Sequence, residues 1–544
     1  MIKEIPVLII GGGSVGLSLS AELGWRNVDN LVVEQNETLN PHPRANAVAN
    51  RTMEYYRRWG IDQALTEAGV PPDHPADYYW VSSLYGRELH HVSLPPFKKM
   101  REVHKNGPKI REEHTWSPYL KTITGQNEVE KHLLSYVHSR PSSELLFNKK
   151  LIGFHQDADG VDCDLECKTS GARETIRCRF LVACDGGRSF VRQQMGAGLS
   201  GQSNLARFVS IYFSAPNFKN CHKFGQANIF FPLHRDCAGF ILNWDGGTTF
   251  TYHLMLSDQQ QWDRMDPIQA IERVLGSHTE IEVMSVQPWT AHALVADQYR
   301  DGRVFLAGDA AHLFSPTGGF GMNTGVSDII NLAWKLEAVL EGWGGEYLLD
   351  SYFSERHTIG VRNTREAADC FDCLNDVMVY GDELDEEGPK GDRFREELGR
   401  VLKDQEKLIS SSGTLLGYRY EGSPIVVSDG TPEPKDDPRK YVPVARPGHR
   451  APHIWLEEGV SILDKLGKGF TLFKFTAIDT HMLEESAECV GLPLEVVSIT
   501  NTAAADLYDA NLVLVRPDLM IAWRSDNLPD QLSELLNQVR GAYQ

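Results

Sequence analysis

The first pattern in the chain is a short apolar run, Pro6 to Ile10, which leads through glycines into a helical pattern that begins near Ser14. A second apolar run, Asn30 to Glu34, follows that helix. Short apolar runs separated by a helix are typical of the buried strands of α/β domains. This region therefore predicts a strand, a tight glycine turn, a helix and a second strand.

Two later strand patterns each end at an aspartate beside a glycine. One begins near Phe180 and stops at Asp185-Gly186, and the other begins at Val304 and stops at Gly308-Asp309. After the second come a proline, several glycines and an amphipathic pattern that predicts a helix from about Asn323. Between the two lie four stretches of alternating apolar and aromatic residues. These predict an antiparallel sheet and cover residues 208–216, 227–234, 237–244 and 249–256.

The last third of the chain changes character twice. A helical segment from Tyr347 to about Val377 is followed by residues 381–392, where six acids among glycine and proline favour a solvated loop. From about Tyr441 the pattern is again that of a folded domain. It contains a strand at residues 470–475, a hairpin at residues 511–524 and a final amphipathic helix.

Composition narrows the class of protein. With 544 residues, 41% of them hydrophobic, the chain is expected to form two or three domains. The formal net charge of −20 argues against nucleic acid as a partner, because phosphates would repel such a surface. No run resembles a secretory signal or approaches the roughly 18 apolar residues of a membrane span. Nine cysteines without the spacing of a small secreted domain are expected to be reduced, so we predict a cytoplasmic protein without a membrane partner.

The glycines after the first strand carry the first chemical signal. Gly11, Gly13 and Gly16 have the spacing that lets a backbone approach a pyrophosphate at a helix N-terminus. Glu34 lies about 20 residues further on, where an acceptor for a ribose 2′-hydroxyl is expected. An acid there would repel the 2′-phosphate of NADP, so the pattern predicts bound NAD or FAD. No residues stand at metal-ligand spacing, and no metal is expected.

The later motifs decide between the two cofactors. The stretches "FLVACDGGRSFVRQQMG" and "SPTGGFGMNTGVSD", in this order after the N-terminal fingerprint, resemble those of the class A flavoprotein aromatic hydroxylases. Within that family the resemblance is closest to the hydroxylases of aromatic polyketides and of phenylpropionate degradation. It implies an α/β fold with a Rossmann-like FAD-binding domain, an antiparallel-sheet substrate domain and a thioredoxin-like C-terminal domain. The expected bounds are 1–200 with 285–380, 75–125 with 201–284, a helical and acidic linker at 381–440, and 441–544.

The resemblance also implies roles for individual residues. The ADP half of FAD would be held by Gly11, Gly13, Gly16 and Glu34. Arg44 would lie along the cofactor, and Gln126 at the flavin. A motif linked to both FAD and NAD(P)H would contain Asp185 and Arg188, while Asp309 would accept hydrogen bonds from the ribityl chain. The flavin ring would contact a loop and helix start that comprise Pro316 over its reactive face, Gly319, Gly321, Met322 and Asn323.

The implied reaction is hydroxylation of a small phenolic or other electron-rich aromatic ring. In the family, NADPH or NADH reduces FAD, and a flavin C4a-hydroperoxide formed with O2 delivers one oxygen atom to the ring. Proton loss from the phenol needs a base or a relay, since its ordinary pKa is about 10. Phenol hydroxylase has an aspartate where this chain has Asn46. Tyr252 and His253, which we expect to be pocket residues, are the candidates for this role, and the alternative is a substrate acidic enough to ionise alone.

Other functions stay open at this point. The same family chemistry supports Baeyer–Villiger oxidation or epoxidation of a polyketide-like substrate. A flavin oxidase, or a flavoprotein without enzymatic activity, would share the nucleotide fingerprint. The sequence does not fix the oligomeric state, and a homodimer is one assembly that it allows.

Overall fold

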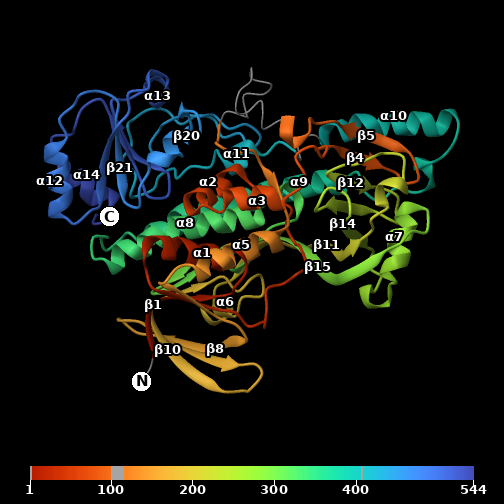
Figure 1. Ribbon diagram of the computed structural model, residues 1–544, viewed down its shortest axis with the longest axis horizontal. Helices are drawn as coiled ribbons and strands as arrows, with labels where there is room; N and C mark the ends of the chain where they lie inside the picture. The colour runs from red at the N-terminus through yellow and green to blue at the C-terminus, as the bar shows by residue number, and fades with distance from the viewer. Residues whose placement is uncertain (1–2, 100–115, 406–408, 544) are drawn as a thin grey trace.

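The computed structural model describes residues 3–99, 116–405 and 409–543. Figure 1 shows three sheet-containing units around a pair of long helices that cross the middle of the molecule. Parts of the predicted segments 75–125 and 381–440 lie outside the described residues, and the predicted domain boundaries stay predictions. No helix within the described ranges combines the length and the hydropathy that crossing a lipid bilayer requires.

The first sheet has a parallel core that presents the carboxyl ends of its strands to one edge. Its order is β16-β17-β10-β1-β2-β7, with the β8 and β9 hairpin attached to β10. The predicted strand, turn, helix and strand are confirmed as β1, α1 and β2. The strands are β1 (Lys3–Ile10), β2 (Asn30–Val33), β7 (Ser143–Leu146), β8 (Lys149–Gln156), β9 (Val161–Cys167), β10 (Arg173–Ala183), β16 (Arg300–Asp301) and β17 (Val304–Leu306).

The second sheet confirms the four predicted strands as β11 to β14. Its order is β18-β15-β11-β14-β13-β12-β4-β5, and every pairing is antiparallel except that of β12 with β4. The strands are β4 (Tyr78–Val81), β5 (Glu88–Val92), β11 (Leu199–Ser214), β12 (Ile229–Pro232), β13 (Gly239–Asn243), β14 (Thr249–Leu256), β15 (Glu282–Ala296) and β18 (His312–Leu313). A two-stranded ribbon of β3 (Ala47–Val48) and β6 (Thr122–Ile123) completes this part of the chain.

The helices agree with the predicted pattern apart from two details. The helix expected from about Asn323 begins two residues earlier, as α8 (Gly321–Leu340), and is followed by α9 (Asp350–Asn375). The prediction of an acidic loop over residues 381–392 is wrong for its last residues, which belong to α10 (Pro389–Lys403). Pro389 occupies the first turn of this helix, and Leu398 and Leu402 are buried on it. Other helices are α1 (Ser14–Arg26), α2 (Asn50–Trp59), α3 (Asp62–Ala68), α5 (Gln126–His138), α6 (Phe190–Gln194) and α7 (Pro267–Leu275).

The C-terminal unit is a four-stranded sheet of order β22-β21-β23-β24. β21 pairs parallel with β22 and antiparallel with β23, which pairs antiparallel with β24. This is the arrangement expected of a thioredoxin-like domain, and it contains the predicted hairpin and final helix. Its elements are β21 (Phe470–Lys474), α12 (His481–Cys489), β22 (Leu494–Ser498), α13 (Thr502–Tyr508), β23 (Leu512–Val515), β24 (Ile521–Ser525) and α14 (Leu532–Val539).

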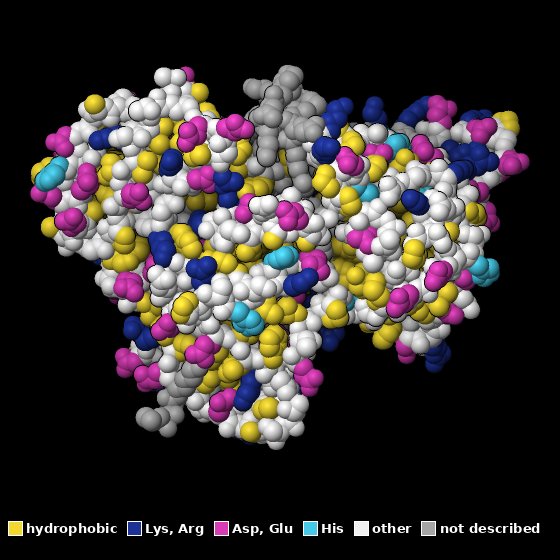
Figure 2. Space-filling model, in the orientation of Figure 1, with side chains coloured by type: hydrophobic (Ala, Val, Ile, Leu, Met, Phe, Trp, Pro, Cys, Tyr) yellow, Lys and Arg dark blue, Asp and Glu magenta, His cyan; other side chains and the backbone are white. Residues whose placement is uncertain are grey.

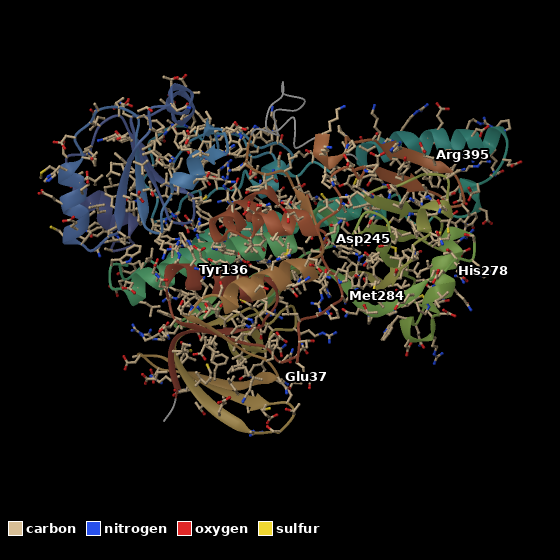
Figure 3. The ribbon with its side chains drawn as sticks, viewed as in Figure 1. Glu37, Tyr136, Asp245, His278, Met284 and Arg395 are labelled. Atoms are coloured by element: carbon tan, nitrogen blue, oxygen red, sulfur yellow. The ribbon has the colours of Figure 1, made fainter. Side chains whose placement is uncertain are left out.

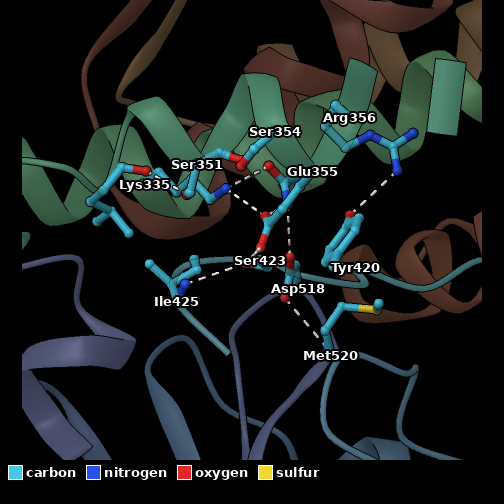
Figure 4. Close-up of polar contacts among 12 residues, drawn as sticks. Lys335, Ser351, Ser354, Glu355, Arg356, Tyr420, Ser423, Ile425, Asp518 and Met520 are labelled. Carbon is cyan, nitrogen blue, oxygen red and sulfur yellow. Dashed lines mark hydrogen bonds and ion pairs between the residues drawn. The ribbon is translucent and has the colours of Figure 1, made fainter. Parts of the chain in front are cut away.

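The C-terminal unit is joined to the long helices by buried charges centred on Glu355 of α9. Arg516 donates to both carboxylate oxygens of Glu355, at 2.5 and 2.9 Å, and Lys335 of α8 donates to the same carboxylate at 2.7 Å. Figure 4 shows Lys335, Ser423 and Asp518 gathered around this carboxylate. All three charged side chains are fully buried, so none can leave the cluster without stranding its partners.

A second buried carboxylate, Asp328 of α8, holds the turn that follows β17. It accepts hydrogen bonds from the Gly308 backbone N–H at 3.1 Å, from His312 Nε2 at 2.6 Å and from Arg356 Nε at 2.8 Å. Burial alone would raise the pKa of Asp328, but His312 and Arg356 outweigh it and lower the pKa. Arg356 also donates to the Tyr420 hydroxyl, a contact drawn in Figure 4. The Gly308-Asp309 turn is therefore fixed from beneath by a paired charge.

On the face of the molecule in Figure 2, acidic and basic side chains are interspersed among apolar ones. The described residues on this face form no continuous basic surface of the kind that nucleic acid requires.

Replacing Asp328 with Ala tests this support. The substitution strands the buried Arg356 guanidinium, so the free energy of unfolding should fall by about 3–5 kcal/mol, measured by thermal and denaturant unfolding. Because the pKa of Asp328 is lowered in the folded state, its contribution is present at neutral pH and lost as the pH falls through that pKa. The control is Glu396→Ala, which removes an exposed pair with Arg400 and should cost about 0–1 kcal/mol. Equal losses in the two variants would contradict a supporting role for Asp328.

Candidate cofactor and substrate site

The site is a cavity of about 540 Å³ between the carboxyl ends of the first sheet and one face of the second sheet. This volume is in the usual range for a cofactor or ligand pocket. Its first wall comes from the sequence motifs and includes Gly13, Ser14, Val15, Arg44, Gln126, Gly186, Asp309, Pro316, Gly319, Gly321 and Met322. Its second wall comes from the antiparallel sheet and includes Tyr78, Trp80, Phe231, Phe240, His253 and Trp289.

The three glycines of the N-terminal fingerprint have different structural roles at the start of α1. A side chain at Gly11, which has φ of +108°, or at Gly16 would collide with backbone carbonyls, so both are required by close packing. At Gly13, in contrast, an added Cβ would meet nothing nearer than Glu130 Oε1 at 3.7 Å. Gly13 is the N-cap of α1 and lines the cavity, and at this helix end the Ser14 N–H donates to Glu130 Oε1 at 3.0 Å. The N–H groups that follow in the first turn can meet a pyrophosphate.

Glu34 follows the end of β2 and is not among the residues that line the cavity. Its Oε2 accepts the Gly12 N–H at 2.8 Å, and its Oε1 accepts both N–H groups of Asn36, from the backbone at 2.8 Å and from the side chain at 2.7 Å. A carboxylate has about four acceptor sites, so capacity remains for a ribose hydroxyl. These contacts orient the carboxylate beside the glycine turn before any ligand arrives.

The loop from Pro316 to Gly321 leaves space beside its backbone. Gly318 and Gly319 have φ of +79° and +68°, a region that favours glycine. An added Cβ would lie 3.7 Å from its nearest neighbour at both Gly319 and Gly321, so the free space belongs to the cavity. α8 starts at Gly321 without a side-chain cap, and its positive end faces the same space.

Asn323 has a different position from its neighbours in the motif. It is almost fully buried and is not among the residues that line this cavity. Its amide donates to the carbonyls of Ala47 and Gly319, at 3.0 and 2.7 Å, and its oxygen accepts the Ala49 N–H at 2.8 Å. Through these hydrogen bonds, Asn323 holds the glycine loop against the two-stranded ribbon of β3 and β6.

Two aspartates have free acceptor capacity in or beside the first wall. The Asp309 carboxylate is exposed to the cavity and accepts no hydrogen bond from any described residue, and the surrounding protein raises its pKa. Asp185 accepts the Phe190 and Val191 N–H groups through Oδ2, while its buried Oδ1 has no partner among the described residues. Arg188 is exposed and lies outside the lining of the cavity.

Arg44 and Gln126 both line the cavity, as expected for residues along a cofactor. The Gln126 amide donates to Glu130 Oε1 at 2.7 Å, and the same oxygen accepts the Ser14 N–H at 3.0 Å. The start of α1, the open glycine loop and the Asp309 carboxylate together fit a dinucleotide that carries a flavin. The described residues contain no group of three or more His, Cys, Asp or Glu side chains suited to a metal.

Tyr252 and His253 lie on opposite faces of β14. Tyr252 as a pocket residue is wrong, because its fully buried side chain donates to the Cys237 carbonyl at 2.6 Å and packs in the core on the α7 side. His253, the next residue along β14, points to the opposite face and lines the cavity. Its ring stacks on Phe240 at 4.4 Å, and neither nitrogen has a hydrogen-bond partner in the described part of the chain. Burial and the neighbouring His42 lower its pKa to about 3, so the ring is neutral at neutral pH.

Several polar lining residues, Lys121, His42 and Ser210 among them, were not predicted from the sequence. Lys121 lines the cavity, forms no hydrogen bond or ion pair with the described residues, and has a pKa lowered by burial. His42 and Ser210 line it from a loop and from β11. Asn46, which was noted only as a departure from phenol hydroxylase, lines it too. A lone lysine before a short strand and a histidine in a loop carry no periodic signal that would reveal them.

Replacing Glu34 with Ala tests the nucleotide end of this site. Loss of a hydrogen bond to a charged acceptor should weaken FAD retention by about 1–3 kcal/mol, measured by flavin fluorescence titration of the apoprotein. The matched control is Glu37→Ala, because Glu37 is exposed three residues further along and is labelled in Figure 3. If Glu34→Ala retained FAD as tightly as Glu37→Ala, the carboxylate would have no role in binding.

Comparisons with known proteins agree with this site. Residues 4–367 match the family model described as FAD binding domain, and residues 444–542 match that of the aromatic-ring hydroxylase C-terminal domain. A putative polyketide hydroxylase of Streptomyces halstedii is 32% identical and covers 96% of this chain and 94% of its own length. Tetracenomycin B2 monooxygenase-dioxygenase of Streptomyces olivaceus is 32% identical over 98% of both chains.

Solved structures of similar proteins cover the whole fold. The rebeccamycin biosynthetic enzyme RebC with reduced flavin is 34% identical, with a TM-score of 0.89 and complete coverage of both chains. Aklavinone-11 hydroxylase in complex with FAD and aklavinone is 27% identical, with a TM-score of 0.83 over 99% of this chain and 100% of that one. The chain therefore belongs to the FAD-binding aromatic-ring hydroxylase family and is an FAD-dependent monooxygenase.

Proposed function

We propose that this enzyme uses NAD(P)H and O2 to hydroxylate a phenolic or other electron-rich aromatic ring. The observation that carries the proposal is the single cavity in which the motif wall faces an aromatic wall. Bound FAD would supply electron transfer from NAD(P)H and the activation of O2. Similarity to a putative polyketide hydroxylase and to an aklavinone hydroxylase supports a polycyclic aromatic substrate.

The motif wall is suited to stabilise a reduced flavin. The positive end of α8, a helix of 20 residues, faces the cavity beside Gly321 and Met322. Aligned backbone N–H groups favour negative charge, which a flavin gains on reduction. Asp309 is free to hold a sugar-alcohol chain from the other side of the loop.

The sheet wall is suited to a flat ring that carries an acidic hydroxyl. Trp80 and Phe231 are stacked at 5.0 Å, and Trp289 lies edge-on to the His253 ring at 5.7 Å. Asp309 is the only acidic residue in the described lining, whereas Lys121 lines the cavity without a partner among the described residues. A lysine cation beside a ring hydroxyl favours its phenolate form. This form is the more nucleophilic one, and Asn46 cannot generate it as a base.

The proposal is tested by oxygen uptake with NADPH and with NADH, each measured with and without a panel of monocyclic and polycyclic phenols. We expect a phenol to accelerate uptake and to be recovered with one added oxygen atom, at one product per NAD(P)H. Hydrogen peroxide formed without an oxygenated product would indicate a flavin oxidase instead. A lactone as the product would indicate Baeyer–Villiger oxidation, and an epoxide would indicate epoxidation, in place of hydroxylation.

Replacing Lys121 with Met tests the choice of a phenolic substrate. Loss of a charged hydrogen bond should weaken binding of an ionised phenol by about 1.5–3 kcal/mol, or roughly 10- to 150-fold, measured by perturbation of the flavin spectrum. Binding of the corresponding methyl ether, which cannot ionise, should change little. Lys131→Met, at a largely exposed position on α5, is the control. Equal weakening of the phenol and its ether would show that Lys121 only shapes the pocket.

A further inference from the structure

His42 lies between two serine hydroxyls at the edge of the cavity. Its Nε2 is 2.9 Å from Ser210 Oγ, and its Nδ1 is 2.6 Å from Ser285 Oγ. The His42 side chain is almost fully buried, and both His42 and Ser210 line the cavity. The three side chains therefore form a continuous hydrogen-bonded chain that starts at the substrate wall.

The second sheet explains why this chain starts at the cavity. On β11, Ser210 stands directly opposite His253 of β14 and Gln287 of β15. Side chains directly opposite each other on paired strands point to the same face. All three residues line the cavity, so they form a polar row across an otherwise aromatic wall.

The other end of the chain lies toward the surface. Ser285 is half-buried and is not among the residues that line the cavity. Ser285 is therefore partly accessible to solvent and can exchange protons with water.

His42 is uncharged at neutral pH. Burial, together with the positive charge of Arg44, lowers the pKa of His42 to about 4. The other titratable groups that face it are the neutral His253 and Tyr212, whose ring meets the imidazole edge-on at 6.0 Å. A neutral imidazole has one donor and one acceptor nitrogen, so it can pass a proton from one serine to the other without keeping a charge.

We propose that Ser210, His42 and Ser285 form a proton relay that carries the hydroxyl proton of the aromatic substrate to solvent. This inference rests on the proposed function. The substrate proton moves to Ser210 Oγ as the Ser210 proton moves to His42 Nε2. The Nδ1 proton then moves to Ser285 Oγ as the Ser285 proton leaves to water. One proton is released, the substrate becomes a phenolate, and no charge remains on the relay.

The relay gives the substrate proton a route out of the cavity. A phenol has a pKa of about 10, so its proton must be removed by a connected group at neutral pH. Asp309 is the only acid in the described lining and belongs to the motif wall. Lys121 can stabilise the resulting anion but, as an ammonium group, cannot accept the proton.

The test uses the FAD-bound enzyme and 4-nitrophenol, whose neutral and anionic forms differ in absorbance. In stopped-flow mixing near neutral pH, the wild type should ionise the bound phenol rapidly. Ser285→Ala should slow ionisation about 100-fold with little change in the dissociation constant, because Ser285 does not line the cavity. His42→Gln should slow it similarly and move the pH profile of kcat/KM toward higher pH.

Further variants separate the relay from a structural role. Ser285→Thr keeps the hydroxyl and should restore the rate, while His278→Gln, at an exposed position labelled in Figure 3, should leave it unchanged. Wild-type ionisation rates in Ser285→Ala and Ser210→Ala would overturn the relay even if His42→Gln did not fold. A wild type that binds the phenol without ionising it would overturn it as well. Failure of every phenol to trigger oxygen uptake would instead contradict the proposed function.

Discussion

The structure depends on the pairing of one buried carboxylate, that of Asp328. It lies fully buried on α8 and is shared by the Gly308 N–H, His312 and Arg356. A buried charge must stay paired, so the turn after β17, the start of β18 and helix α9 cannot move independently of α8. The Asp309 carboxylate and the glycine loop are therefore presented to the cavity by a rigid frame. Through Arg356 and Tyr420 the same frame reaches the segment that leads to the C-terminal unit.

The cavity is specified by polar atoms that the protein leaves without partners. In most folded proteins a buried polar group is hydrogen-bonded, because an unpaired group costs free energy. Within the described ranges, His253 and Asp185 Oδ1 are buried without hydrogen-bond partners, and Asp309 and Lys121 face or line the cavity without a partner. Their arrangement matches a ligand with a sugar-alcohol chain and a charged ring system on one side, and an acidic aromatic ring on the other.

Much of the fold could be predicted because its elements repeat with local periods. The strand, glycine turn and helix at the N-terminus, the strands β11 to β14 and the C-terminal hairpin all have such patterns. The choice between Tyr252 and His253 could not be made from sequence. Alternation shows that they face opposite sides of β14, but only tertiary packing decides which side meets α7. His42 was missed because its partners are 168 and 243 residues away in the chain.

The central claim is that one cavity between the two sheets holds both the flavin ring and the aromatic substrate. A crystal structure of the enzyme with FAD and with a phenol that triggers oxygen uptake tests it most directly. The account predicts the isoalloxazine ring against residues 315–322, with the phenol beside His253 and Ser210 on the sheet wall. A flavin ring remote from the glycine loop, or a phenol bound outside this cavity, would contradict it.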